Sequence, residues 1–491
     1  MKKYLICLLL IVLLLLFVIL LPSCQKEETP LADYLTVTPC ETGGYYVAFD
    51  ETCTAYPKQL EIPSSYGGEP IVEIAADGFC AADALETIVI PDSVRKIGED
   101  AFKDCNALVR VVLPQSMGTI GKRAFFGCTS LREIIIPDSV RVIGEAAFYE
   151  CTGLQNVVLP SGLTEIADHT FNKCSALQSM TLPDGVTRVG VCAFYGCAAL
   201  ETLILSEQLR EIGAYAFQEC TALRELSFGT AFRTMGKSAF EKCTALECVS
   251  VAEGITSVAD GAFRDCSALV AISFPATLRE IGDEAFIRCE ALKSVTFSNG
   301  IMTLGKRAFK LCGALQMIAL PDSLQQMGDE AFAECGMLGR VSIGASLESI
   351  PNNAFYSCMG LKELVLSEGL YEIGGNAFRG CYLLADVVLP NSLQRIGSHA
   401  FRGCAMKEIR LPYELRVIDD YAFRDCSYLT SIAVSTAIET IGTGVFLDST
   451  RLAILTYNGT CAQWNAIEKS NGWDQGTDIR SVQCTDGEIL R

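Results

Sequence analysis

The segment Glu211-Ile-Gly-Ala-Tyr-Ala-Phe-Gln-Glu-Cys-Thr-Ala-Leu-Arg-Glu-Leu-Ser-Phe228 shows the pattern that decides the fold. Its central phenylalanine belongs to a series that recurs every 23 residues and then continues, after the loss of one residue, at Phe423 and Phe446. The regular members are Phe79, Phe102, Phe125, Phe148, Phe171, Phe194, Phe217, Phe240, Phe263, Phe286, Phe309, Phe332, Phe355, Phe378 and Phe401. A cysteine follows three positions later in fifteen consecutive units, from Cys105 to Cys426. Seventeen such units indicate an internal repeat.

Each unit contains the signals of two short strands. The segments 131–136 and 361–366 end in alternating β-branched or aliphatic residues, which is typical of a strand, and a proline often follows. A second apolar pair, such as Val94 and Ile97, ends in glycine in twelve of the seventeen units. That glycine indicates either a positive φ or a close backbone approach. The Ala-Phe-x-x-Cys stretch between the strands predicts a helical or 3₁₀ turn.

A unit of 23 residues cannot enclose a core, so neighbouring units must stack their apolar faces into a solenoid. The expected fold is an α/β repeat of about 17 coils with a parallel sheet, which would place the repeats at residues 63–454. Open ends of a solenoid need caps, because an unpaired edge strand recruits other chains. We expect these caps at residues 35–62 and 455–491, where the repeat is absent.

The N-terminus predicts export from the cytoplasm. Lys2 and Lys3 precede seventeen uncharged residues, a layout typical of a signal segment at residues 1–23. The stretch Leu21-Pro22-Ser23-Cys24 resembles the lipobox of bacterial lipoproteins, which implies a lipid on Cys24 and a polar tether at residues 24–34. An uncleaved membrane anchor and a freely secreted product remain alternatives. All three place the repeats outside the cytoplasm, and the favoured one is a membrane-anchored lipoprotein at the bacterial cell surface.

Composition excludes several classes of function. The 491 residues carry 58 acidic and 39 basic side chains, a formal charge of −19, which argues against a nucleic-acid partner because phosphate binding needs a basic surface. The two histidines, His169 and His399, lie ten units apart and cannot share a metal or a proton. No metal, cofactor or catalytic residue is predicted, so we expect a protein that is not an enzyme. Only a pocket at Trp464 and Trp473 would favour catalysis.

The repeat pattern Ile-Gly-x-x-Ala-Phe-x-x-Cys-x-x-Leu-x-x-Ile-x-Leu-Pro resembles the BspA-like leucine-rich repeat of bacterial and protist surface proteins. Residues 60–71 are similar to the first unit of such proteins, and residues 457–464 and 484–487 are similar to their closing segment. The resemblance implies a leucine-rich-repeat-like curved solenoid whose parallel sheet lies on the concave side. It also implies adhesion or protein binding, without naming a ligand or an active site.

The cysteines form two groups. The fifteen repeated cysteines are expected to be small buried apolar side chains, because stacking holds successive Cβ atoms farther apart than a disulfide prefers. Cys40 and Cys53 flank the N-terminal cap, and Cys461 and Cys484 flank the C-terminal one. Each pair is a possible disulfide that would staple a segment with little core of its own.

The outward strand positions give the functional prediction. Val89, Val112, Ile135 and Val158 would align into an aliphatic stripe, with Arg110, Glu133 and Asn156 beside it. Exposed apolar stripes often mark partner sites, although β-branched residues also occur there for strand propensity alone. We therefore expect a protein partner on the solenoid face. The alternatives are a structural spacer without a ligand, and a glycan-binding module, for which Tyr149, Tyr195 and Tyr356 at one unit position offer slight support.

Overall fold

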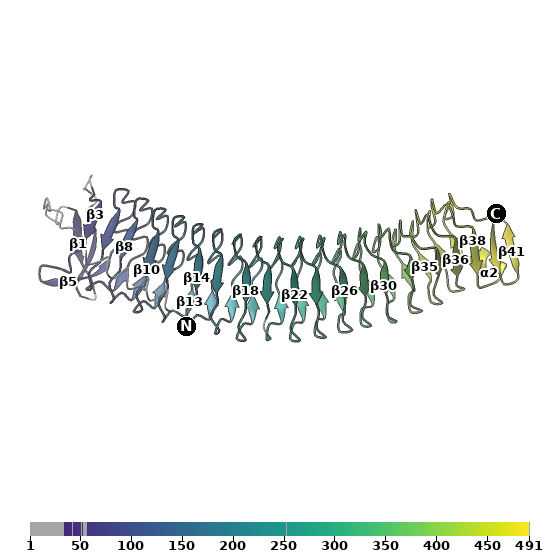
Figure 1. Ribbon diagram of the computed structural model, residues 1–491, viewed down its shortest axis with the longest axis horizontal. Helices are drawn as coiled ribbons and strands as arrows, with labels where there is room; N and C mark the ends of the chain where they lie inside the picture. Colours follow the sequence, from purple (N-terminus) through teal and green to yellow (C-terminus); the bar gives the residue numbers. More distant parts are fainter. Residues whose placement is uncertain (1–33, 42, 51, 53–55, 252, 491) are drawn as a thin grey trace.

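The computed structural model describes residues 34–41, 43–50, 52, 56–251 and 253–490. These residues form one solenoid of about 19 parallel turns of about 23 residues, which appears in Figure 1 as a curved rod. The seventeen predicted units therefore account for most of the turns, and the flanking segments add one turn at each end. The predicted parallel-sheet solenoid is confirmed.

Each turn contributes one strand to a long-strand face. These strands are β3 Gln59–Glu61, β6 Thr87–Val89, β8 Arg110–Val112, β10 Glu133–Ile135, β12 Asn156–Val158, β14 Ser179–Thr181, β16 Thr202–Ile204, β18 Glu225–Ser227, β20 Cys248–Ser250, β22 Ala271–Ser273, β24 Ser294–Thr296, β26 Met317–Ala319, β28 Arg340–Ser342, β30 Glu363–Val365, β32 Asp386–Val387, β34 Glu408–Arg410, β36 Ser431–Val434, β38 Ile454–Tyr457 and β40 Ser481–Cys484. The middle residue of most of these strands points inward, while its two neighbours point outward, as the alternation in sequence predicts.

The opposite side of each turn carries a shorter strand, and together these make a short-strand face. Its members are β5 Glu69–Ile74, β7 Lys96–Ile97, β9 Thr119–Ile120, β11 Val142–Ile143, β13 Glu165–Ile166, β15 Arg188–Val189, β17 Glu211–Ile212, β19 Thr234–Met235, β21 Ser257–Val258, β23 Glu280–Ile281, β25 Thr303–Leu304, β27 Gln326–Met327, β29 Ser349–Ile350, β31 Glu372–Ile373, β33 Arg395–Ile396, β35 Val417–Ile418, β37 Thr440–Ile441 and β39 Glu468–Lys469. The register between neighbours in the repeats is 23 residues, for example Ile97 with Ile120, and it becomes 22 where one residue is deleted, at Ile396 with Ile418. At the C-terminal cap it lengthens to 28, at Ile441 with Lys469.

The flanking segments continue both faces and cover their ends. At the N-terminus, β1 (Leu35–Pro39) pairs antiparallel with β2 (Tyr45–Phe49), and β4 (Ser65–Tyr66) pairs with β5. At the C-terminus, β41 (Gly487–Leu490) pairs antiparallel with β40. Helix α2 (Cys461–Ala466) precedes β39, and it is the one α-helix in the described part of the chain. The helical component expected of an α/β repeat is therefore absent from the described repeats, which consist of strands and turns.

The Phe side chains form a continuous stack through the centre of the solenoid. Neighbouring ring centroids lie 5.2 Å apart at Phe79 and Phe102 and 5.8 Å apart at Phe423 and Phe446, with the planes within 18° of each other at that C-terminal end. All seventeen rings are at most 1% exposed. Other aromatic rings close the stack at both ends in an edge-to-face arrangement, with Phe49 at the first ring and Trp473 at the last.

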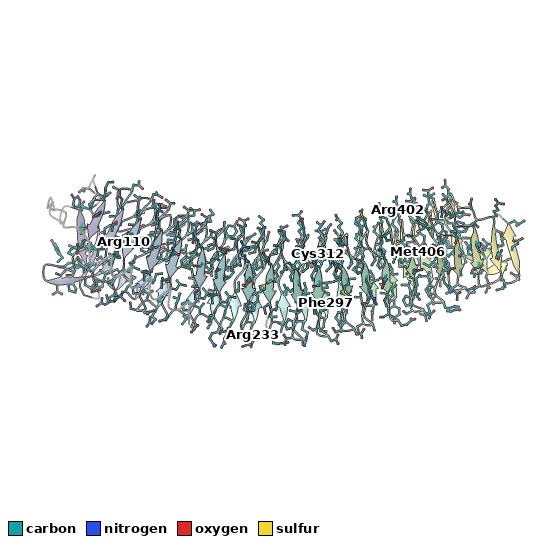
Figure 2. The ribbon with its side chains drawn as sticks, in the orientation of Figure 1. Arg110, Arg233, Phe297, Cys312, Arg402 and Met406 are labelled. Carbon is teal, nitrogen blue, oxygen red and sulfur yellow. The ribbon has the colours of Figure 1, made fainter. Side chains whose placement is uncertain are left out.

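The rod bends within the plane of Figure 1, and its strands run across the long axis of the rod. The turn residue Arg402 lies at the inner edge of the bend, and Arg233 lies at the outer edge (Figure 2). In this view the strands occupy the flanks of the rod, whereas the resemblance implied a sheet on the concave side. The coils are therefore closest together at the edge formed by the Ala-Phe-x-x-Cys turns, which includes Arg402 and is called the turn edge below.

The Ala-Phe-x-x-Cys turns are not helical, because left-handed residues stand on both sides of each Phe. The residues two positions before and two positions after it have positive φ in all seventeen units, for example +53° at Asp100 and +58° at Asp104. Most of these residues are not glycine. Their backbone N–H groups donate to the next coil, as Asp104 does to the carbonyl of Phe126. Hydrogen bonds between coils therefore hold a conformation that costs about 1–2 kcal/mol for each L-residue.

Two explanations were predicted for the glycine that ends the second apolar pair in twelve units, a positive φ or a close backbone approach. The structure supports the close approach. None of the twelve glycines has a positive φ. A Cβ on Gly213 would lie 2.7 Å from backbone atoms of Gly190 and Val191 in the preceding coil. The row of glycines thus allows the backbones of neighbouring coils to pack directly against each other where the short strand ends.

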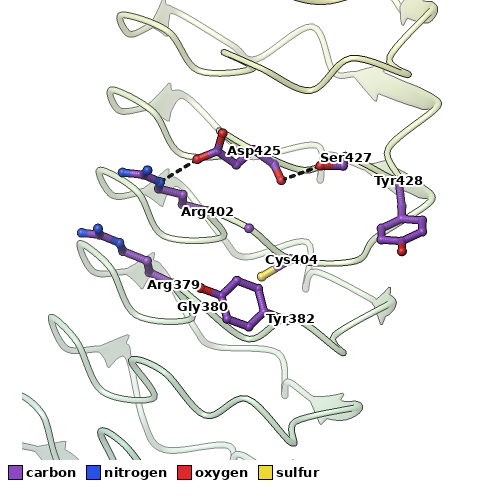
Figure 3. Close-up of a pocket in the computed structure, with 9 residues that line it drawn as sticks. Arg379, Gly380, Tyr382, Arg402, Cys404, Asp425, Ser427 and Tyr428 are labelled. Carbon is purple, nitrogen blue, oxygen red and sulfur yellow. Dashed lines mark hydrogen bonds and ion pairs between the residues drawn. The ribbon is translucent and has the colours of Figure 1, made fainter.

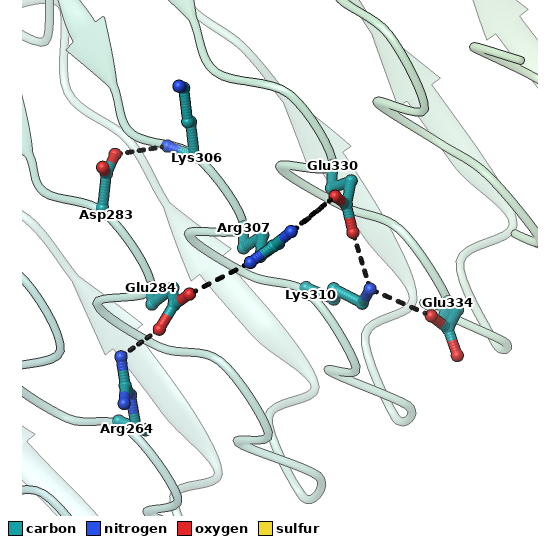
Figure 4. Close-up of polar contacts among 8 residues, drawn as sticks. All are labelled: Arg264, Asp283, Glu284, Lys306, Arg307, Lys310, Glu330 and Glu334. Carbon is teal, nitrogen blue, oxygen red and sulfur yellow. Dashed lines mark hydrogen bonds and ion pairs between the residues drawn. The ribbon is translucent and has the colours of Figure 1, made fainter.

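Opposite charges meet between several pairs of neighbouring coils, for example Lys173 with Glu150 and Lys242 with Glu219, each 23 positions apart. Figure 4 shows a chain of ion pairs from Arg264 through Glu284, Arg307 and Glu330 to Lys310. The pKa of Glu330 is lowered by its hydrogen bonds to Arg307 and Lys310. Each such surface pair contributes at most about 1 kcal/mol. Their main consequence is that opposite charges meet between neighbouring coils at these positions.

Replacing Ala81 by glycine is expected to stabilise the protein. Ala81 is exposed, has a φ of +54°, and donates its N–H to Lys103 of the next coil. Glycine removes the left-handed strain at the cost of a more flexible unfolded chain, so we expect a net gain of about 0.5–1 kcal/mol. Chemical denaturation measures the gain. Ala107→Gly, at a position outside the left-handed region, should instead destabilise, and equal effects of the two changes would contradict the argument.

Candidate binding surface

The predicted aliphatic stripe is present as a row on the long-strand face. Parallel pairing places Val89 beside Val112, Ile135 beside Val158, and Thr181 beside Ile204. Ile135 and Val158 are each 55% exposed, whereas Val89 and Val112 are half-buried. Among the four residues of the predicted stripe, the accessible ones are therefore those on β10 and β12.

A polar row runs beside the aliphatic one, two residues earlier in each strand. Arg110, Glu133 and Asn156 occupy it and are all exposed. Glu133 and Asn156 are neighbours in the β10–β12 pair. The seven residues predicted for partner contact thus lie on one face of four consecutive coils, β6 to β12, because the 23-residue register carries each row straight along the rod.

A second apolar area lies on the same face towards the C-terminus. Val388 is 82% exposed, Val365 is 48% exposed and Ile454 is 52% exposed. A hollow of about 530 Å³ opens beside Val388, lined also by residues of β34, β36 and β38. The alternation in sequence placed Val365 and Val388 on the outward row, but their degree of exposure depends on the arrangement of the neighbouring coils.

The repeated cysteines lie in the interior beside the Phe stack. All fifteen are at most 1% exposed and are free thiols. Each Sγ–H donates to the carbonyl of a phenylalanine 25 or 26 residues earlier, for example from Cys243 to Phe217 at 3.3 Å. Ser449 makes the same contact to Phe423 in the last unit. The sequence predicts burial of this row, but the donor role appears only in the structure.

The cysteines of the C-terminal cap are brought together. The Sγ atoms of Cys461 and Cys484 and a carboxylate oxygen of Asp486 lie within 4.8 Å of one another, with both cysteines as free thiols. The hydrogen bond with Cys484 is the largest of the effects that raise the pKa of Cys461 to about 12. This proximity is compatible with the predicted disulfide, which stays a proposal.

At the N-terminal cap, Cys40 is partly exposed and hydrogen bonds with Tyr46, which raises the pKa of that phenol to about 12. Cys53, its predicted partner, lies outside the described residues, as do Cys24 and the predicted signal and tether up to residue 33. Within the described ranges, no helix has the length and apolar character required to cross a membrane.

The two tryptophans of the C-terminal cap are structural. Trp464 and Trp473 are 3% and 5% exposed, and their rings meet edge to face at 5.8 Å. Trp473 in turn packs on Phe446 at the end of the Phe stack. They therefore seal the C-terminal end of the core.

Comparison with known protein families identifies the repeat. The family model described as "BspA type Leucine rich repeat region (6 copies)" matches residues 72–175, 143–270, 256–385 and 348–467. No curated protein matches the chain. The match is thus to a repeat family and not to an enzyme family.

Solved structures of bacterial leucine-rich repeat proteins are similar to this chain. A leucine rich cell surface protein from Faecalibacterium prausnitzii shares 26% identity, with 70% of this chain and 96% of that one covered and a TM-score of 0.42. A leucine-rich repeat protein from Bacteroides ovatus shares 22% identity over 94% of this chain and 100% of that one, with a TM-score of 0.39. The T. pallidum leucine rich repeat protein shares 33% identity over 40% of this chain and 91% of that one, with a TM-score of 0.38.

The family model covers most of the repeat region, and the described turns have the period and the buried phenylalanine and cysteine rows of the repeat pattern. This chain therefore belongs to the BspA type leucine-rich repeat family.

Proposed function

We propose that this protein is displayed at a bacterial cell surface and binds another protein through its long-strand face, in adhesion or a related interaction. Membership of a repeat family of bacterial surface proteins supports the general role. A solenoid offers extended surfaces for recognition, since its core is filled by side chains.

The contact is proposed at the aliphatic stripe on β10 and β12. The observation that carries it is the pairing of Ile135 with Val158, both more than half exposed, beside Glu133 and Asn156. Aliphatic side chains surrounded by polar groups are the usual composition of a protein contact, with the apolar centre excluding water. The formal charge of −19 supports a protein partner over a nucleic acid.

The anchor is proposed at Cys24, through a lipid attached after cleavage of residues 1–23. The acidic chain would be repelled by an anionic membrane, so a lipid is the physical means of retention. The native protein should then partition into detergent, and a Cys24→Ser variant should remain in the aqueous phase.

The contact is tested by making the stripe polar. Ile135→Ser combined with Val158→Ser introduces the residue that occupies the same row at Ser227 and Ser250, so folding should be preserved. We expect saturable binding to immobilised surface-protein extracts to weaken at least tenfold, which corresponds to about 1.4 kcal/mol. Far-UV circular dichroism checks the fold.

The matched control is Val365→Ser with Val388→Ser, the same change in the same row at the other end. A loss of binding in the control alone would move the contact to the C-terminal area. Absence of saturable binding by the unchanged protein would favour the alternative of a structural spacer.

A further inference from the structure

The unit that lacks one residue has an altered turn. In sixteen of the seventeen units, the residue three positions after the cysteine or its replacement donates its N–H to the carbonyl of that cysteine, as Leu384 does to Cys381. The unit at Cys404 has only one residue between Cys404 and Met406, where the others have two. The turn is missing there, and Ala405 instead donates to Leu384 of the preceding coil at 2.9 Å.

The missing turn leaves a notch in the turn edge of the rod. A pocket of about 420 Å³ lies there, lined by Arg379, Gly380, Tyr382, Arg402, Gly403, Cys404, Asp425, Ser427 and Tyr428. Tyr382 and Tyr428 come from the two coils on either side of the short one, and they are 58% and 53% exposed. Figure 3 shows the two arginines on one side of the notch, the ring of Tyr428 on the opposite side, and the ring of Tyr382 between them below Cys404.

The notch combines aromatic rings with polar groups and has no aliphatic side chain in its lining. A pocket that binds a leucine or valine side chain of a peptide would be lined by aliphatic side chains. A sugar ring, in contrast, presents C–H groups on its faces and hydroxyl groups at its edge. The rings of Tyr382 and Tyr428 suit those faces, whereas Asp425 and Ser427 can accept hydrogen bonds from hydroxyl groups.

The positive charges of the notch favour an anionic ligand. Arg402 is paired with Asp425 at 3.0 Å, but no described carboxylate lies within ion-pair distance of Arg379. The Arg379 guanidinium donates to Asn376 Oδ1 at 3.2 Å and lies over the ring of Tyr356 at 5.7 Å, and both of these groups are neutral. The pKa of His399 nearby is lowered by burial and then by Arg379, Arg402 and Arg424. A guanidinium without a carboxylate partner is suited to bind one from a ligand.

We propose that this notch binds a carboxylated saccharide, with the sugar ring against Tyr382 and Tyr428 and the carboxylate on Arg379. The site is separate from the stripe on β10 and β12, so it stands whether or not that contact is correct. Its volume lies within the range of small-molecule sites, about 300–1,000 Å³.

Calorimetric titration of the full chain with sialyllactose and with trigalacturonate tests the proposal, with lactose and α-1,4-galactotriose as their neutral counterparts. At least one acidic sugar should bind at least tenfold more tightly than its neutral counterpart. Equal binding of the neutral sugars, binding of neither acidic sugar, or preferential binding of an acidic hexapeptide would overturn the assignment.

Three variants place the ligand in the notch. Tyr382→Ala and Arg379→Gln should each weaken binding at least tenfold, whereas Tyr413→Ala and Arg416→Gln, exposed positions outside the lining, should not. Insertion of one alanine between Ala405 and Met406 should restore the turn, fill the notch and abolish binding without lowering the thermal midpoint. Retained binding in the insertion variant would show that the ligand lies elsewhere.

Discussion

Phe263→Ala is expected to destabilise the protein by about 3–5 kcal/mol, because the change removes one ring from the middle of the Phe stack. Phe263 is fully buried, and its centroid lies 5.5 Å from Phe240 and 5.3 Å from Phe286. Each coil contacts only its neighbours, so the cavity weakens both interfaces of one coil and cannot be filled from elsewhere.

A second consequence follows from the one-dimensional architecture. Weakening one central coil should uncouple the two halves of the solenoid, so that denaturant unfolding divides into two transitions. Circular dichroism against urea measures both the loss and the number of transitions. Phe126→Ala removes a half-buried ring that stacks on Tyr149 at the surface, and it should cost less. A single unfolding transition, with a loss of unfolding free energy similar to that of Phe126→Ala, would contradict the prediction.

The second large effect is expected in alkaline solution. Burial raises the pKa of the repeated cysteines, to about 12 at Cys335, Cys381 and Cys426, from a value near 9 in the unfolded chain. Above pH 9 the unfolded chain releases thiol protons that the folded chain retains. The stabilising contribution of the thiols is therefore complete below pH 9 and is lost as the pH rises towards 12.

The fifteen thiols act together. Each one changes the free energy of unfolding by at most about 1.4 kcal/mol per pH unit, so even partial contributions sum to a steep loss of stability between pH 9 and pH 11. The measurement is the denaturation midpoint as a function of pH. In a variant with Cys220, Cys243, Cys266, Cys289 and Cys312 replaced by serine, the slope should be about a third smaller. Equal slopes would attribute the loss to other groups.

The binding surface was partly predictable. Strict alternation in the strands identified which residues face outward, and the 23-residue period identified which of them lie side by side. It could not show that Val112 is half-buried while Ile135 is 55% exposed, or that Val388 reaches 82%. The exposed fraction of each side chain depends on how neighbouring coils are arranged and on which residues the cap covers. Both are properties of the whole stack.

The notch was visible in sequence only as a missing residue between Phe401 and Phe423. The deletion alone does not show whether the coil tightens, shifts its register or loses a turn. The structure shows that the short-strand face absorbs it by a register of 22, while the turn edge opens between Tyr382 and Tyr428. A local change in chain length becomes a pocket because both neighbouring coils keep their full turns.

The sequence by itself determined the repeat, the buried rows of phenylalanine and cysteine, the parallel solenoid and the family, because these depend on periodic burial that each unit encodes locally. Only the tertiary structure decided the left-handed residues beside each Phe, the close backbone contact at the row of glycines, the donor role of the thiols and the notch at Cys404. All four depend on contacts between residues of different coils, whose distances are fixed by stacking and not by any single unit.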